Sequence, residues 1–417
     1  MESVSSLAPS GSLAGLRILD LSRVLAGPWC TQMLGDLGAE VIKVERPGQG
    51  DDTRHWGPPF DPNTGDAAYF QCANRNKRSL AVDFSSPMGA DLLRRLAADC
   101  DVLVENFKPG TLERYGLGAQ QLLAAQPRLI VCSISGFGHS GPLRERAGYD
   151  FIVQAMGGLM SVTGPENAGY KCGVAVADLF TGMHAVVGIL AALRHRDRTG
   201  LGQHVDLALF DCQLSMLANL ASQWLCDGEP PRRLGNAHPT IAPYETLPCA
   251  DGDLVLAVGN DAQFRRCVEA LGRVEWAQDP RFSSNAKRLQ YRKDLHELLA
   301  GELRRNSREH WVTRFEALGV PATAVASVPE ALQHPQSLAR DMLGPLNPAE
   351  PDGRLTVQSP LKLSLSPVQT RYPPPRLGEH SQRLLRDLGI SDAEIQALQD
   401  AGVIPPPALG MDANRRH

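Results

Sequence analysis

Apolar and polar positions alternate regularly through the first third of the chain. Apolar runs of strand length occur at residues 16–21, 41–45, 79–83, 101–105 and 129–134. Amphipathic stretches with helical spacing lie between several of them, at residues 29–37, 86–96 and 119–125. Ser86 followed by Pro87 is a typical helix start, and Gly38 is placed to end the first of these helices. This alternation predicts an α/β fold with a doubly wound, Rossmann-like parallel sheet.

The pattern changes after residue 225. Residues 227–233 combine proline, glycine and charge, and they predict a linker. A β-hairpin is predicted at residues 243–258, and helices follow over residues 261–271, 292–303 and 307–318. The chain is proline-rich and irregular over residues 320–375, ends in helices over 381–388 and 392–401, and has a tail that we expect to be disordered. These features predict a second, smaller domain.

Asp178 is the most prominent polar position between these two parts. It follows an apolar, strand-like run at residues 173–177 and begins a long apolar helix, and a predicted strand (203–207) and amphipathic helix (211–225) come after it. The free N–H groups and the dipole of a helix N-terminus stabilise negative charge. We therefore expect an aspartate that is ionised at neutral pH. The pattern leaves two roles open for it, a helix cap or a nucleophile.

Composition describes an ordinary soluble protein. The 417 residues are 43% hydrophobic and 21% charged, and a net charge of -4 does not favour a nucleic-acid partner. No two of the nine cysteines form C-x-x-C, so reduced thiols in a cytosolic protein are expected instead of zinc or disulfides. The start of the chain lacks the pattern of a secretory signal, and the longest apolar run, 185–193, is too short to span a bilayer. We expect a cytoplasmic protein with no membrane partner.

Motifs for common cofactors are absent or incomplete. Residues 136–141 fit G-x-G-x-x-G, but Pro142 follows where a helix should open, so we predict neither a nicotinamide nor a flavin site. The sequence contains no P-loop, no H-E-x-x-H or histidine cluster for a metal, and no G-x-S-x-G. Basic residues cluster near the ends of the predicted strands, and a doubly wound sheet binds ligands at the carboxyl ends: Arg46, Lys77, Arg78, Lys108 and Arg114. They suggest a ligand that bears phosphates.

Several stretches resemble family III coenzyme A (CoA) transferases. They are residues 15–28, 37–47, 74–79, 104–107, 148–150, 173–184, 199–203 and 377–380, in the family's order along nearly the whole chain. Residues 56–60, 164–167, 237–239 and 243–244 look closest to the succinyl-CoA:glutarate branch. The resemblance implies an interlocked homodimer. It also implies a large domain over residues 12–225, a small domain over 235–325, and a linker and C-terminal part over 326–405 that returns to the large domain.

The resemblance further implies roles for individual residues. Asp178 matches the nucleophile, and CoA or an acyl-CoA is the substrate. The other matching positions are Val24, Leu25 and Ala26 along the CoA site, Arg46, Lys108 and Arg114 at its phosphates or adenine, Val82, Asn106 and Phe107 nearby, and Tyr149 by the thioester. Arg23 and Leu25 replace the His and Gln of the formyl-CoA branch, and that branch's glycine-rich flap has no counterpart near Gly235. These departures argue against formate and oxalate as substrates.

The implied reaction moves CoA from succinyl-CoA to a small dicarboxylate such as glutarate, through an aspartyl anhydride and an aspartyl-CoA thioester. Carnitine, aromatic succinates, mesaconate and citramalate stay open as acceptors. An α-methylacyl-CoA racemase is the nearest alternative, but it needs a histidine where Tyr149 stands, and a phenol with a pKa near ~10 is a poor base at pH 7. A non-catalytic CoA-binding protein is the other alternative, and the presence of Asp178 argues against it.

Overall fold

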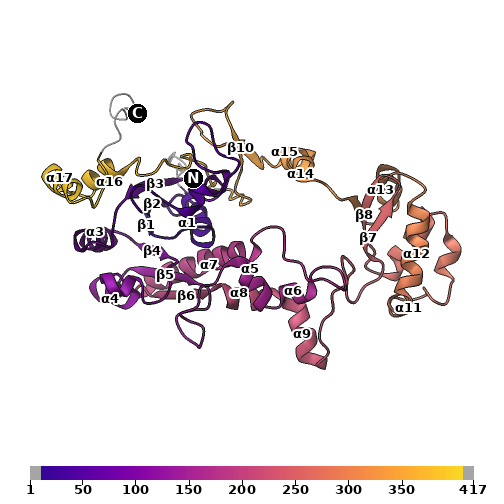
Figure 1. Cartoon of the computed structure of the whole chain (residues 1–417). Helices are drawn as coiled ribbons and strands as arrows, with labels where there is room; N and C mark the ends of the chain where they lie inside the picture. Colours follow the sequence, from indigo (N-terminus) through magenta and orange to yellow (C-terminus); the bar gives the residue numbers. More distant parts are fainter. Residues whose placement is uncertain (1–10, 407–417) are drawn as a thin grey trace, which may run out of the picture. The chain divides into compact units, whose positions relative to one another are not determined.

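The computed structural model describes residues 11–406, which form two compact units (Figure 1). One unit contains Cys172–Ala221 together with the described chain up to Gly158 and from Leu338 onwards. The other contains Leu159–Lys171 and Ser222–Ser337. The smaller unit therefore takes in residues 159–171, which the expected domain boundaries assign to the large domain.

A six-stranded sheet organises the first unit. Its strands are β1 (Arg17–Asp20), β2 (Glu40–Glu45), β3 (Lys77–Ala81), β4 (Val102–Glu105), β5 (Ile130–Ser135) and β6 (His204–Ala208). They pair in the order β3-β2-β1-β4-β5-β6, and every pairing is parallel. Leu19 of β1 lies opposite Ile42 on one side and Leu103 on the other. The strand order reverses between β1 and β4, and ligands bind at the carboxyl ends of the strands around such a point.

Helices cover both faces of this sheet, so the predicted doubly wound α/β fold is confirmed. One face packs on α3 (Pro87–Ala98), α4 (Ala119–Ala125), α16 (Ser381–Asp387) and α17 (Asp392–Asp400). The other packs on α1 (Ala26–Asp36) and α7 (Val176–Thr199), with α5 (Asp150–Met156) and α8 (Leu209–Met216) beside α7. By length and composition α7 could cross a membrane, yet Ala185, Ile189 and Ala192 are buried, as expected for a core helix.

The second unit has its own core. Strands β7 (Tyr244–Cys249), β8 (Gly252–Ala257) and β9 (Ala322–Ala324) form an antiparallel sheet. Its helices include α6 (Leu159–Val162), α10 (Asp261–Ala270), α11 (Asn285–Gln290), α12 (Arg292–Leu303) and α13 (Arg308–Ala317). Leu256, Phe264 and Phe315 are among its buried residues. The predicted hairpin and the three helices predicted after it are confirmed.

Shorter elements complete the described chain. They are η1 (Asp52–His55), α2 (Ala68–Gln71), η2 (Leu112–Tyr115), α9 (Ala218–Asp227), η3 (Val274–Ala277), α14 (Val328–Gln333), α15 (Pro335–Ala339), β10 (Leu343–Pro345) and β11 (Leu355–Val357).

Three predictions of local structure are wrong. Residues 173–177 are no strand, because residues 173–174 form a bend and Val176 already belongs to α7. The single helix expected over 211–225 is interrupted between α8 and α9, where Ala218 has a φ of 44°. The stretch expected to be irregular contains α14, α15, β10 and β11. The predicted disordered tail lies, from residue 407 on, outside the described residues.

Candidate active site

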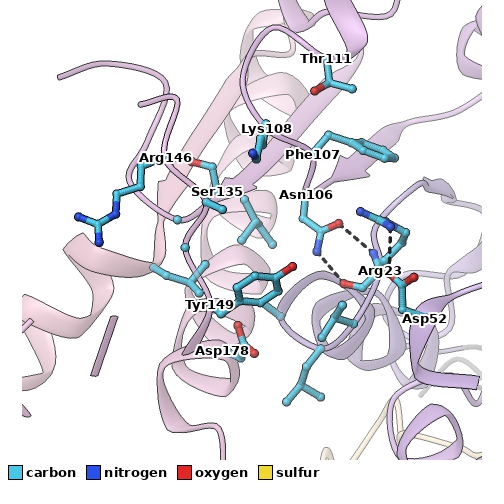
Figure 2. A pocket seen from close by; sticks show the side chains of 18 of the residues that line it. Arg23, Asp52, Asn106, Phe107, Lys108, Thr111, Ser135, Arg146, Tyr149 and Asp178 are labelled. Atoms are coloured by element: carbon cyan, nitrogen blue, oxygen red, sulfur yellow. Dashed lines mark hydrogen bonds and ion pairs between the residues drawn. The ribbon is translucent and has the colours of Figure 1, made fainter. Parts of the chain in front are cut away.

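A cavity of about 620 Å³ lies at the carboxyl ends of β1, β4 and β5, within the unit that holds the large sheet (Figure 2). Its walls come from the segments that follow these strands and from the first turn of α7. Eight of the predicted site residues line it: Val24, Leu25, Ala26, Asn106, Phe107, Lys108, Tyr149 and Asp178. The fold thus brings together residues that are up to 154 positions apart in the sequence (178 − 24).

A second cavity, of about 400 Å³, adjoins the first and shares Arg23, Asp52, Phe107 and Thr111 with it. Arg46 and Val82 line this second space. Phe84 packs edge-on against both Phe107 and Tyr115, with ring centroids 5.7 and 5.8 Å away. Aromatic edges and faces of this kind suit a planar ring as ligand. Arg114 lines neither cavity, because its side chain is exposed on η2.

Asp178 is the third residue of α7, and its carboxylate reaches the larger cavity. Burial, and then the negative charge of Asp150, raise the pKa of Asp178 from its ordinary value of 3.8 to about 7. Within residues 11–406, no group donates a hydrogen bond to this carboxylate. The expectation that it is fully ionised at neutral pH is therefore wrong.

Besides burial, the contacts of Asp150 at the N-terminus of α7 matter. Oδ1 of Asp150 accepts the backbone N–H of Ala177 at 2.8 Å and that of Asp178 at 3.3 Å. These donors are among those that would otherwise stabilise negative charge at the first turn. The cap position belongs to Ala175, so the capping role considered for Asp178 is also wrong.

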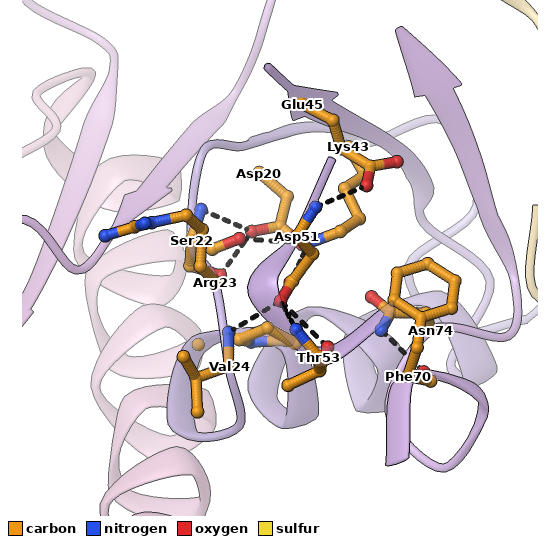
Figure 3. Close-up of polar contacts among 12 residues, drawn as sticks. Asp20, Ser22, Arg23, Val24, Lys43, Glu45, Asp51, Thr53, Phe70 and Asn74 are labelled. Atoms are coloured by element: carbon orange, nitrogen blue, oxygen red, sulfur yellow. Dashed lines mark hydrogen bonds and ion pairs between the residues drawn. The ribbon is translucent and has the colours of Figure 1, made fainter. Parts of the chain in front are cut away.

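A buried set of charges supports the loop that follows β1 (Figure 3). Nζ of Lys43 lies 2.9 Å from Oδ2 of Asp51, and both side chains are fully buried. Oδ1 of Asp51 accepts the backbone N–H of Val24 at 3.2 Å. Val24 has a φ of 70°, which is rare for a β-branched residue. Burial alone would raise the pKa of Asp51, but Lys43 and hydrogen bonds from Thr53 outweigh it and lower the pKa to about 2.

Asn106 joins two walls of the larger cavity. Its Oδ1 accepts the backbone N–H of Arg23 at 2.9 Å, and its Nδ2 donates to the Arg23 carbonyl at 2.6 Å. Nη1 of Arg23 in turn pairs with Asp52 at 2.9 Å. The loops after β1 and β4 are thereby fixed to each other.

The structure adds cavity residues that the sequence did not single out as site residues. Trp56, Ser135 and Arg146 line the larger cavity, and Asp150 acts on Asp178 from α5. Trp56 and Asp150 lie inside the family-like motifs W-G-P-P-F and G-Y-D, and these motifs could have identified them as site residues. Arg23 also lines the larger cavity, whereas Arg233 belongs to the second unit and donates to the carbonyls of Pro165 and Glu166.

The sheet, its switch point and the carboxylate in the cavity define a doubly wound α/β protein built to bind and react with a ligand at its strand ends. Residues 13–381 match CoA-transferase family III, so the chain belongs to this family and is an enzyme that uses CoA thioesters as substrates.

Known proteins of this family align along most of the chain. A succinate–glutarate CoA-transferase of Agrobacterium fabrum is 46% identical over 90% of this chain and 95% of its own. The human succinyl-CoA:glutarate CoA-transferase is 39% identical, over 94% of this chain and 90% of its own. The crystal structure of a CaiB/BaiF family protein from Brucella suis is similar, with a TM-score of 0.83 and 46% identity, and covers 91% of this chain and 100% of its own.

Proposed function

We propose that this enzyme transfers CoA from succinyl-CoA to a small dicarboxylate such as glutarate, and that Asp178 is the nucleophile. The relatives from Agrobacterium fabrum and human are glutarate CoA-transferases, and this supports the choice of donor and acceptor. The observation that carries the role of Asp178 is its placement: a carboxylate without a hydrogen-bond donor among the described residues, at the wall of a cavity of about 620 Å³.

The reaction proceeds by exchange of acyl groups at one carboxylate. An oxygen of ionised Asp178 attacks the thioester carbonyl of succinyl-CoA, the C–S bond breaks, and a mixed anhydride and CoA thiolate result. The thiolate attacks the aspartyl carbonyl, which releases succinate and leaves an aspartyl-CoA thioester. The acceptor carboxylate attacks this thioester and forms a second anhydride, and the thiolate then attacks the acceptor's acyl carbon. The products are a new acyl-CoA and the original carboxylate.

The two adjoining cavities suit the two ends of CoA. The larger one, with Val24, Leu25 and Ala26, would hold the pantetheine arm and the thioester next to Asp178 and Tyr149. The aromatic second cavity, with Val82 and Phe107, would hold the adenine ring, while Arg46 and Lys108 meet phosphates. Arg114 is exposed beside Tyr115 and would approach a phosphate from outside the cavities.

Tyr149 favours CoA transfer over racemisation. It lines the cavity with Asp178, at the position where a racemase needs a base for the α-carbon. A phenol holds its proton near pH 7 and cannot remove a weakly acidic α-proton efficiently.

The same proposal includes a homodimer in the cytoplasm. Met183, Val187 and Leu190 on α7 are exposed apolar side chains, and Phe151 and Ile152 on α5 are exposed as well. A second copy of the chain would remove such a face from water. Within residues 11–406 none of the nine cysteines forms a disulfide, which suits a reducing compartment.

The test is mass spectrometry of mixtures that contain the enzyme, succinyl-CoA and one acid from a panel beginning with glutarate. A new acyl-CoA that requires both enzyme and acid is expected. The Asp178→Ala variant should make none and should still bind CoA in calorimetry. Deuterium uptake at the α-carbon of a branched acyl-CoA, without transfer to any acid, would replace the proposal by racemisation. Full turnover by Asp178→Ala would remove Asp178 from the mechanism.

A further inference from the structure

Asp150 connects the nucleophile's helix to a neighbouring helix. Its Oδ1 accepts the N–H groups of Ala177 and Asp178, at 2.8 and 3.3 Å. Its Oδ2 accepts a hydrogen bond from Nε2 of Gln154 at 2.7 Å. Gln154 is fully buried, and its Oε1 accepts the N–H of Cys172 at 2.8 Å. Two side chains of α5 therefore hold the segment that leads into α7. Gln154 binds its start at Cys172, and Asp150 binds its end at Ala177 and Asp178.

We propose that Asp150 is a positioning residue: its two hydrogen bonds hold the first turn of α7 so that Asp178 faces the thioester. This inference rests on the proposed role of Asp178. A carboxylate that binds its proton more firmly is a stronger base, and in general a stronger nucleophile once ionised. A smaller fraction of Asp178 is then ionised at pH 7, but each ionised carboxylate is more reactive.

Other titratable groups surround this pair. Arg23, Lys108, Arg146 and Tyr149 line the cavity. The elements packed against the first half of α7 contribute Cys30 on α1 and Cys212 on α8, and α7 itself contributes His184. Tyr69 on α2 has its pKa raised to about 12 by burial and by the charges of Asp178, Cys72 and Asp150. Among the described residues, burial and Asp150 are what raise the pKa of Asp178.

Two substitutions separate the charge of Asp150 from its hydrogen bonds. Asp150→Asn keeps an acceptor oxygen for the α7 amides, removes the charge and loses the bond from Nε2 of Gln154, a loss that Gln154→Met measures by itself. Asp150→Ala removes both. The readout is the pH dependence of kcat/KM for succinyl-CoA, together with formation of the enzyme–CoA adduct in a single turnover, measured by intact-protein mass spectrometry. Asp392→Asn, at an exposed first-turn aspartate of α17, is the matched control for loss of one negative charge.

We expect the acidic limb of the kcat/KM profile, near pH 7 in the parent enzyme, to move down by half a pH unit or more in Asp150→Asn. Asp150→Ala should lower kcat at least tenfold at every pH, with KM for succinyl-CoA within about threefold. Asp392→Asn should leave the profile in place. An unmoved acidic limb in Asp150→Asn would overturn the electrostatic role, and parental kcat in Asp150→Ala would overturn the positioning role.

Gln154→Met keeps the charge of Asp150 and removes its buried partner, so it serves if the Asp150 variants do not fold. It should lower kcat without moving the acidic limb, and parental kcat would contradict the proposal. Hydrogen exchange gives a readout independent of turnover: peptides covering residues 176–180 should exchange faster in Asp150→Ala. If the parent enzyme forms no adduct, the proposed function fails, whereas unchanged exchange in Asp150→Ala refutes the positioning role alone.

Discussion

Substitution of Asp51 by asparagine tests whether the buried charges under the cavity stabilise the fold. Asp51 and Lys43 form an ion pair at 2.9 Å in which neither side chain is exposed. Asparagine has nearly the same shape and can still accept the N–H groups of Val24 and Thr53. The substitution therefore removes the charge and leaves the Lys43 ammonium buried without its closest counter-ion.

The expected loss of stability follows from the lowered pKa of Asp51, and the exposed Arg23–Asp52 pair provides the comparison. The decrease of the Asp51 pKa from 3.8 to about 2 corresponds to about 2.4 kcal/mol in favour of the ionised form, at ~1.36 kcal/mol per pH unit. Removing one partner of a buried pair costs about 3–5 kcal/mol when the remaining charge stays buried. Since the pKa is lowered, this contribution is present above pH 4 and is lost only as the pH falls toward 2. At pH 7 we expect Asp51→Asn to lower the free energy of unfolding by about 3 kcal/mol.

Urea unfolding at pH 7, followed by circular dichroism, measures this loss. Asp52→Asn is the matched control, because Asp52 pairs with Arg23 where both side chains are about half exposed, and such pairs contribute below ~1 kcal/mol. Adding Lys43→Met to Asp51→Asn should restore at least 1 kcal/mol, since no unpaired charge is then buried. A loss below 1 kcal/mol in Asp51→Asn, or no recovery in the double variant, would refute this account.

Three further predictions concern other sites. Burial raises the pKa of Glu105 to about 7, so this carboxyl lowers the free energy of unfolding as the pH rises from 4.5 to 7. Glu105→Gln should remove about 3 kcal/mol of that loss. If the free energies of unfolding of parent and variant in urea change in parallel over pH 4.5–7.5, this prediction is contradicted. Arg288 is 1% exposed and donates to the carbonyls of the buried residues Ala242 and Phe282, so Arg288→Met leaves both acceptors without this donor and should destabilise the second unit by about 2–4 kcal/mol in thermal unfolding; a smaller loss than Asp279→Asn causes would count against it. Arg46→Ala should raise KM for succinyl-CoA about tenfold with kcat unchanged in steady-state kinetics, whereas a fall in kcat alone would speak against a phosphate contact.

The large sheet could be predicted because its signals are local. Strands of a parallel sheet are buried on both faces, so residues 102–104 stand out as an apolar run. The predicted cap is confirmed as well, since Oγ of Ser86 accepts the N–H of Gly89 at 3.1 Å. No pattern of apolar and polar residues predicts the interruption at Ala218 or the pairing of β10 with β11.

Lys108 could be predicted from its place after a strand, because strand ends of a parallel sheet meet at one edge. The other cavity residues, such as Val24, Tyr149 and Asp178, were assigned from the resemblance to the family. The raised pKa of Asp178 could not be predicted in the same way. It depends first on burial and then on Asp150, which lies 28 positions earlier and accepts the same backbone amides. The position of Arg114 also depended on the turn of η2, which carries its side chain away from both cavities.

The two walls that meet at the proposed reaction centre are held by the same kind of contact. On one wall, Asp51 accepts the N–H of Val24 and supports a backbone conformation that valine rarely adopts. On the other wall, Asp150 accepts the N–H groups of Ala177 and Asp178. In each case a carboxylate from another segment fixes the main chain and leaves the cavity side of the residue free. Because both walls are formed before substrate arrives, binding need not supply the free energy to order them, and more of it is available to align the thioester with Asp178.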